Sequence, residues 1–254
     1  MFPIELIAVF ALGAISASFV GVVTVRLNTG QSFLSGHSRC DACTTSLSAL
    51  SLVPIISYLI SGGRARCCGS RLSLMSPITE LLLGGLFVLA YFTLGPTSAL
   101  LGMFCAFSAL LALVLYDLSH QMLPPPLLAA FVIVSALTGL LLAPSLAIFF
   151  STLLIAFLIA TCLALIHILS GGRAMGLADA PLAFGLALLV GPAALSGFLF
   201  SFWIGAVIGI VLLARRPRGS RMGVEVPFAP YLAAGFLLAY FTQWNPFVFV
   251  AALH

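Results

Sequence analysis

Two aspartates are the residues of this sequence best placed to do chemistry, because each lies where an apolar segment meets a polar one. Asp117 stands at the end of one apolar run, in the sequence Tyr-Asp-Leu. Asp179 stands at the start of another, in the sequence Gly-Leu-Ala-Asp. An ionisable group at membrane depth is costly, so its presence indicates a functional site with a partner. The chain has only six acidic residues. The first hypothesis is therefore that these two aspartates are partners of each other.

Two carboxyl groups that share a proton can hydrolyse a peptide bond. Repulsion between like charges keeps one group protonated while the other is ionised. The ionised group takes a proton from a water molecule as the water attacks the scissile carbonyl, and the protonated group polarises that carbonyl and then supplies a proton to the leaving amine. Gly176 and Ala178 keep the backbone slim beside Asp179, so a substrate strand could approach. The alternative is that each aspartate only caps a helix or lies in interfacial water, and Asp179, which precedes an apolar run, would be a reasonable N-cap.

The segments that must hold these aspartates are membrane spans. Of the 254 residues 62% are hydrophobic and 6% charged, with a mean hydropathy of +1.26, whereas about 25% of a soluble domain is charged. Apolar runs of roughly 17–25 residues recur along the chain, each long enough to cross a bilayer as a helix. We therefore predict an all-α polytopic helical membrane protein. Its transmembrane helices, about eight in number by this length criterion, are predicted at 4–25, 77–94, 97–116, 126–143, 146–169, 180–195, 196–214 and 228–250.

The arginines predict how these spans are oriented. All ten basic residues are arginines, and each follows an odd-numbered span. Basic loops stay cytoplasmic, so both chain ends are predicted outside and Asp117 and Asp179 share the cytoplasmic side. Because the charge rule takes no account of the aspartates, this agreement supports their pairing. The loop arginines also account for the net charge of +4, and we predict no nucleic-acid partner.

The chain divides into three parts by composition. Residues 1–25 form the first transmembrane helix, residues 26–76 the only long polar stretch, and residues 77–254 the transmembrane core that carries the two aspartates. The polar stretch is too long for a simple connector. We therefore predict a small cytoplasmic loop domain there.

The cysteines of this loop domain predict a zinc site. Cys40 and Cys43 form a C-x-x-C pair, and Cys67 and Cys68 follow in the same loop. The cytoplasm is reducing and tetrathiolate zinc favours paired cysteines, so the pattern favours a metal over disulfides. Adjacent cysteines do not easily both face one tetrahedral centre. Cys40, Cys43 and Cys68 are therefore the firmer ligands, with Cys67 or His37 as the fourth.

Glu80 is the candidate cofactor-binding residue. It lies in the first turn of the second predicted span. A carboxylate near a helix N-terminus is also stabilised by the helix dipole, so a structural role stays open. His120 could tune the aspartate pair, and His167, near the end of the fifth span, is assigned no role.

Seven segments together resemble one known family, the type IV prepilin peptidases, which are G-x-G-D membrane aspartyl proteases of pilus and type II secretion systems. The resemblance covers nearly the whole chain and rests on the order and spacing of the segments. These are 18–27, 39–43, 53–58, 77–81, 117–124, 176–179 and 226–232.

The resemblance implies a reaction, a place and cofactors. The expected activity is cleavage of prepilin or pseudopilin precursors after a short basic leader ending in glycine, by Asp117 and Asp179. The expected place is the bacterial inner membrane, in a multi-pass protein embedded in the lipid bilayer, with the active site on the cytoplasmic side. Many members then N-methylate the new N-terminus, so S-adenosylmethionine is implied beside a structural zinc.

Four positions depart from the family pattern. Ala178 stands where glycine is usual, Ala65 where a cysteine is expected, Gly21 where asparagine is frequent, and Leu52 where a polar residue is expected. All but the first fall in or beside the region that the resemblance associates with methyl transfer. We therefore expect the peptidase activity to be retained and place N-methylation in question.

Three other hypotheses fit less well. A transporter that binds protons or a cation on the two carboxylates predicts polar residues through the midplane, and the spans show almost none. A non-catalytic subunit of a pilus or secretion assembly would not need both aspartates. A presenilin-like protease should carry a Pro-Ala-Leu motif late in the chain. Residues 192–195, Pro-Ala-Ala-Leu, resemble that motif only loosely and follow soon after Asp179.

Overall fold

A computed structural model describes residues 3–27, 42–43, 45–46, 53–215 and 227–246. The chain forms two compact units, Met1–Leu100 and Leu101–His254. Over the described residues the regular elements are helices, with one isolated antiparallel bridge between Arg64 and Arg71. The all-α prediction is confirmed.

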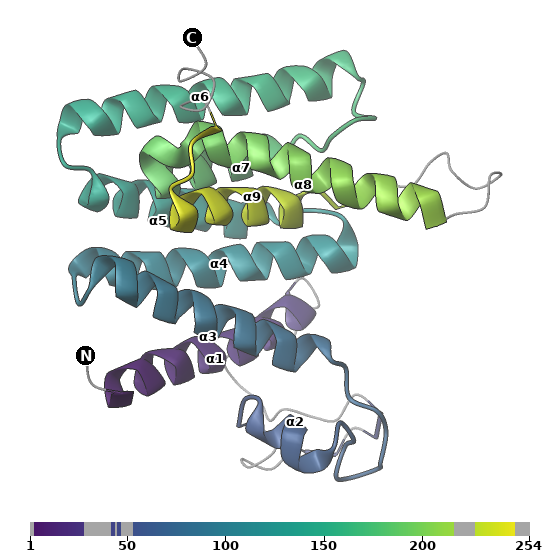
Figure 1. The fold of residues 1–254 in the computed structure, drawn as a ribbon. Helices are drawn as coiled ribbons and strands as arrows, with labels where there is room; N and C mark the ends of the chain where they lie inside the picture. The colour runs from purple at the N-terminus through teal and green to yellow at the C-terminus, as the bar shows by residue number, and fades with distance from the viewer. Residues whose placement is uncertain (1–2, 28–41, 44, 47–52, 216–226, 247–254) are drawn as a thin grey trace. The chain divides into compact units, whose positions relative to one another are not determined.

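The first unit is built on two long helices, α1 (Pro3–Arg26) and α3 (Met75–Leu94), that pack against each other (Figure 1). Their backbones approach closely at two glycines: a Cβ built on Gly13 would lie 2.7 Å from the Cα of Gly84. Small residues at such a crossing are typical of packed membrane helices. A short helix, α2 (Ile56–Ser61), precedes α3 in the loop domain, where we predicted a folded unit without assigning a helix.

The second unit is organised around one short helix. Its elements are α4 (Ser98–His120), α5 (Pro125–Leu142), α6 (Leu146–Leu169), α7 (Asp179–Val190), the 3-10 turn η2 (Gly191–Ala193), α8 (Ala194–Arg215) and α9 (Ala229–Thr242). The α7 helix contacts α5, α6, α8 and α9, and ten of its twelve residues are buried. It is therefore the core of this unit.

The direction of the helices follows from their contacts. On α8, Gly197 lies against Phe236 of α9, and Ser201, one turn later, lies against Leu232 and Gly235, so α8 and α9 run antiparallel. Glycine makes this approach possible, because a Cβ on Gly235 would collide with the backbone of Ser201. The η2 turn begins at Gly191, whose φ is +64°, and Pro192 follows it.

The predicted spans correspond to helices. By length and composition six described stretches could each cross a membrane, one of them the run Asp179–Leu212 that contains α7, η2 and most of α8, and α9 is a shorter apolar helix. Most boundaries moved by a few residues. The exception is the last span, predicted at 228–250: α9 ends at Thr242, and residues 247–250 lie outside the described residues. One change bears on the site, because α4 continues past Asp117 to His120 and makes that aspartate part of a helix.

Candidate active site

Asp117 lies in the last turns of α4 and is held by the beginning of α9. Its side chain is 6% exposed. Its Oδ2 accepts a hydrogen bond, 3.2 Å long, from the backbone N–H of Ala229, the first residue of α9. The first N–H groups of a helix have no partner within the helix and carry partial positive charge. The α9 terminus therefore satisfies and orients this carboxylate.

Asp179 is the first residue of α7 and is 7% exposed. Its Oδ2 accepts a 3.1 Å hydrogen bond from the backbone N–H of Gly176, upstream of the helix. The N-cap position is Ala178, and no side-chain capping bond is made there. The helix-cap alternative for Asp179 is therefore wrong. Residues 176–179 form a turn in which the carboxylate of Asp179 accepts the N–H of Gly176.

The two carboxylates lie close enough to interact electrostatically, although they come from helices distant in sequence. Both are buried, and each accepts a backbone hydrogen bond through its Oδ2. The donor to Asp117 is Ala229 at the start of α9, and the donor to Asp179 is Gly176 in the loop before α7. Asp117 is also near the α9 terminus, so the beginnings of α7 and α9 meet the end of α4 at one end of this unit. Two buried carboxyl groups that interact electrostatically are candidates for acid–base chemistry.

His167, in the last turn of α6, also contributes to this site. Its Nδ1 lies 2.8 Å from the carbonyl oxygen of Met175, and the imidazole lies near enough to Asp179 to interact electrostatically. Since a carbonyl can only accept, Nδ1 carries the proton and donates it. Met175 directly precedes Gly176, the donor to Asp179, so the histidine and the aspartate are tied to adjacent residues of one loop.

Sequence reasoning missed both His167 and Ala229. The only signal for His167 was its place one turn before the loop that leads to Asp179. Ala229 falls in the segment 226–232 that supported the family resemblance, but a backbone N–H has no signature in the sequence. His120 stacks on Tyr116 with ring centroids 4.2 Å apart, directly beside Asp117.

Glu80 belongs to the first unit and is 5% exposed. Its Oε2 accepts a hydrogen bond from the backbone N–H of Ile55 at 2.7 Å, and its Oε1 accepts one from the hydroxyl of Ser76 at 3.0 Å. Ile55 has a φ of 60°, which is disfavoured for a β-branched residue. Glu80 therefore stabilises a strained turn in front of α2, and its role toward a cofactor stays a prediction.

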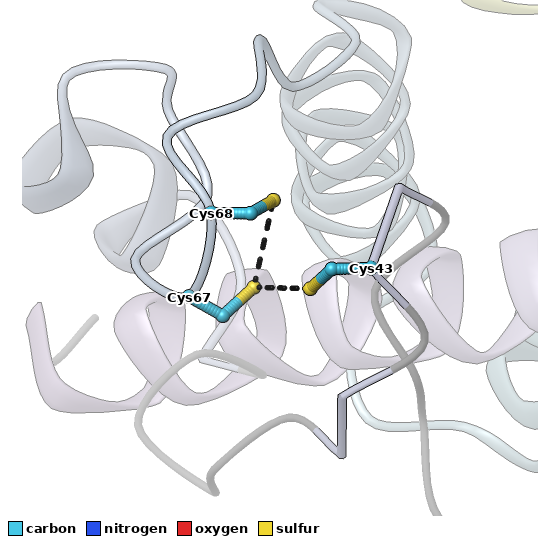
Figure 2. Close-up of side chains that lie close together, drawn as sticks. All are labelled: Cys43, Cys67 and Cys68. Atoms are coloured by element: carbon cyan, nitrogen blue, oxygen red, sulfur yellow. Dashed lines mark hydrogen bonds between the residues drawn. The ribbon is translucent and has the colours of Figure 1, made fainter.

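Three of the predicted metal ligands come together in the loop domain. Figure 2 shows the side chains of Cys43, Cys67 and Cys68 directed toward one another. Their sulfurs lie within 4.8 Å of each other, 3.2 Å for Cys43 to Cys67 and 3.9 Å for Cys67 to Cys68. Tetrahedral zinc, with Zn–S bonds of about 2.3 Å, separates its sulfurs by about 3.8 Å, so this cysteine cluster fits the metal. Cys40 and His37 lie outside the described residues.

The adjacent cysteines can converge because the chain turns sharply after them. Gly69 has a φ of +70°, and its N–H donates to the carbonyl of Ala65 at 2.7 Å. Ala65 itself is buried inside this turn. The sulfur of Cys67 therefore lies with those of Cys43 and Cys68, although the sequence predicted that two adjacent cysteines would not easily both face one metal.

Comparison with known proteins finds relatives that match most of the chain. Residues 11–94 match the family described as Bacterial Peptidase A24 N-terminal domain. The prepilin leader peptidase/N-methyltransferase of Bacillus subtilis strain 168 is 30% identical over 243 residues, which cover 91% of this chain and 92% of that protein. The chain belongs to the prepilin leader peptidase/N-methyltransferase family. Identity at this level over nine-tenths of both proteins confirms the family recognised from the motifs.

Other members of the prepilin leader peptidase/N-methyltransferase family match over shorter stretches. The protein of that name from Burkholderia pseudomallei strain K96243 is 32% identical over 207 residues, 78% of this chain and 65% of its own length. That from Myxococcus xanthus strain DK1622 is 34% identical over 122 residues, 48% of this chain and 36% of its own length. No solved structure matches the chain.

Proposed function

We propose that this chain is an aspartyl endopeptidase that removes the leader of prepilin or pseudopilin precursors, with Asp117 and Asp179 as the hydrolytic pair. The observation that carries the proposal is the buried, interacting pair of carboxylates, 6% and 7% exposed, each fixed by a backbone N–H. Membership of the prepilin leader peptidase/N-methyltransferase family supports the substrate class.

The reaction needs one proton shared between the two carboxyl groups. The ionised group deprotonates a water molecule that attacks the scissile carbonyl, and the protonated group polarises that carbonyl and protonates the leaving amine. Since a coupled pair titrates as a unit, acid and base belong to the pair rather than to one residue each. The N–H groups of Ala229 and Gly176 each hold one carboxylate oxygen, which keeps both carboxyl planes in place while the proton moves.

We place the pair at the cytoplasmic face of the bacterial inner membrane. Arginines follow α1, α6 and α8, and basic loops remain cytoplasmic. The beginnings of α7 and α9 would then face the cytoplasm, where a precursor presents its leader. A basic leader is not attracted by arginine-rich loops, so anionic lipid headgroups would supply that attraction.

Zinc in the cysteine cluster would be structural. Cys43, Cys67 and Cys68 would hold it with Cys40, and the metal would tie the segment around residue 43 to the turn at residues 65–70. S-adenosylmethionine would be required only for N-methylation. The departures at Gly21, Leu52 and Ala65 lead us to propose that methylation, not proteolysis, is the activity that this chain has weakened.

The test uses amide variants that preserve the local hydrogen bonds. In Asp117→Asn and Asp179→Asn the side-chain carbonyl can still accept from Ala229 or Gly176, while the group can no longer exchange a proton. Glu5→Gln is the matched control, because Glu5 is a carboxylate bonded to Tyr91 in the other unit. The assay is cleavage of a prepilin with a basic, glycine-ended leader, in membranes that contain the full chain.

We expect the parent and Glu5→Gln to cleave, and either aspartate variant to lose at least about 10²–10⁴-fold in rate, the range for acid–base catalysis. Cleavage by either aspartate variant at the parental rate would remove it from the pair. If a correctly inserted parent leaves several such precursors intact, the transporter and assembly-subunit hypotheses gain. Adding S-adenosylmethionine and weighing the cleaved product tests methylation separately.

A further inference from the structure

The short helix α2 presents its apolar side chains outward. Ile56, Leu59 and Ile60 are 54%, 71% and 67% exposed. Their spacing of three and four residues puts them on one face of the helix, which we call the α2 apolar face. Tyr58 and Ser61 are only partly exposed, and the hydroxyl of Ser61 donates to the carbonyl of Tyr58 at 3.1 Å.

This arrangement is the reverse of a helix on a water-soluble domain. Such a helix turns its apolar stripe toward the core and its polar residues toward solvent. A helix that lies in the plane of a bilayer surface instead buries its apolar face among the headgroups and upper acyl chains. The α2 apolar face is therefore typical of a helix that contacts lipid.

One hydrogen bond ties the beginning of α2 to the first turns of α3. The N–H of Ile55, directly before α2, donates to Oε2 of Glu80 at 2.7 Å. Glu80 lies five residues into α3, which begins at Met75 and is long and apolar enough to span a membrane. At 1.5 Å per residue the bond lies about 7–8 Å along that span. This bond holds the beginning of α2 beside the start of α3 (Figure 1). In a bilayer that α3 spans from its first turn, this level is the boundary between headgroups and acyl chains.

A compact turn places positive charge directly after α2. The N–H of Leu72 donates to the carbonyl of Gly63 at 2.8 Å, which closes the turn over residues 63–72. This turn carries three exposed arginines, Arg64, Arg66 and Arg71. Clusters of basic residues at the membrane surface attract anionic lipids.

We propose that the α2 apolar face is a membrane-docking surface. It lies in the cytoplasmic interface of the bilayer, and Arg64, Arg66 and Arg71 contact anionic headgroups beside it. A soluble partner or a second copy is the less favoured occupant, because the bond from Ile55 to Glu80 holds this face at lipid depth whether or not a partner is present. The proposal does not depend on the aspartate pair.

The test is lipid photo-crosslinking from neighbouring positions of one helix. A diazirine-bearing phenylalanine analogue is introduced at Leu59, on the apolar face, or at Tyr58, on the opposite face and already aromatic. The full chain is reconstituted in nanodiscs of phosphatidylcholine with a minor share of phosphatidylglycerol. Adducts are identified by mass spectrometry after illumination.

We expect lipid adducts from position 59 at least several-fold more abundant than from position 58, with phosphatidylglycerol enriched above its share of the bilayer. Adducts from position 59 to peptides of this chain, to a second copy or to water alone would overturn the proposal. Equal lipid adducts from the two positions would also overturn it, because no face would then be distinguished.

The arginines are tested by the combined Arg64→Gln, Arg66→Gln and Arg71→Gln variant, with the analogue at position 59. We expect lipid adducts to persist and the enrichment of phosphatidylglycerol to disappear. Enrichment that survives the three substitutions would overturn the assignment of these arginines to the headgroups. Migration of the variant as a monodisperse species in size exclusion ensures that a folded protein is compared.

Discussion

The Nδ1–H of His167 donates to the carbonyl oxygen of Met175 across 2.8 Å and so closes the loop between α6 and α7. The next residue, Gly176, supplies the N–H that holds Asp179. Gly172 completes the closure, since its N–H donates to the carbonyl of His167 and its φ is +78°. The orientation of one member of the proposed pair therefore depends on a histidine on another helix.

Replacement of His167 is expected to lower kcat more than it changes KM. In His167→Leu the carbonyl of Met175 loses its donor, and a hydrogen bond of about 1–1.5 kcal/mol corresponds to roughly a tenfold effect. His167→Asn can place its amide N–H near the position of Nδ1 and should recover most of the rate. Steady-state kinetics on a prepilin substrate measures both. Equal losses in the two variants would contradict a positioning role.

Substitution of Glu80 separates a structural role from a cofactor role. Glu80→Ala leaves the N–H of Ile55 without its acceptor and should lower stability by about 1–3 kcal/mol, whereas Glu80→Gln can still accept that bond. Thermal unfolding in detergent measures the difference. If Glu80→Gln unfolds like the parent but loses binding of S-adenosylmethionine, measured by calorimetry, the carboxylate charge serves the cofactor.

The strain at Ile55 gives an independent check on that turn. A φ of 60° with a ψ of −53° is a sparsely populated conformation that costs a residue with a Cβ about 1–3 kcal/mol. Ile55→Gly should therefore raise the unfolding temperature or leave it unchanged, despite the loss of a side chain. A clear decrease would show that the side chain of Ile55 contributes more than its backbone conformation costs.

Metal analysis of purified protein tests the cysteine cluster. We expect a stoichiometric zinc in the parent, and its loss in Cys43→Ser and in Cys67→Ser, because a thiolate is replaced by a poor ligand. Cys105→Ser is the control, since Cys105 lies in α4 and outside the loop domain. Zinc that remains in Cys67→Ser would assign the fourth position to another residue.

The packing of α8 against α9 is tested by a pair of glycine substitutions. A methyl group on Gly235 would collide with the backbone and hydroxyl of Ser201, whereas one on Gly209 would meet no atom within 4 Å. Overpacking of this kind costs about 1–3 kcal/mol. Gly235→Ala should therefore lower the unfolding temperature in detergent, and Gly209→Ala should not. Similar unfolding temperatures for the two variants would argue against the close approach.

The long helices were predictable because each depends on a property that the sequence states directly. The length of an apolar run predicts a membrane span, and an ionisable residue in or beside a span predicts a functional site. The helices, and Asp117 and Asp179 as candidate site residues, could therefore be predicted from the sequence alone. The contact between Asp117 and Ala229 joins residues 112 positions apart. It could not be predicted, because the donor is a backbone N–H, which nearly every residue type has.

In the loop domain, α2 and the position of Cys67 could not be predicted from the sequence. The six residues of α2 are too few for periodicity to distinguish a helix, and its apolar side chains gave no sign of facing outward. Cys67 and Cys68 converge because Gly69 adopts a positive φ, a conformation that the spacing of the cysteines does not encode. Cys40 and Leu52 stay predictions, as they lie outside the described residues.

The shortness of α7 and α9 has a consequence for the interior of the second unit. Twelve residues of α7 and fourteen of α9 extend only about 18 and 21 Å, and both begin at the aspartate end, whereas a bilayer core is about 30 Å thick. Their far ends border a cavity of about 220 Å³ lined by Val190, Pro192 and Gln243 among others. Because α7 is enclosed by α5, α6, α8 and α9, its shortness leaves this cavity beyond its far end and does not create a mismatch with lipid.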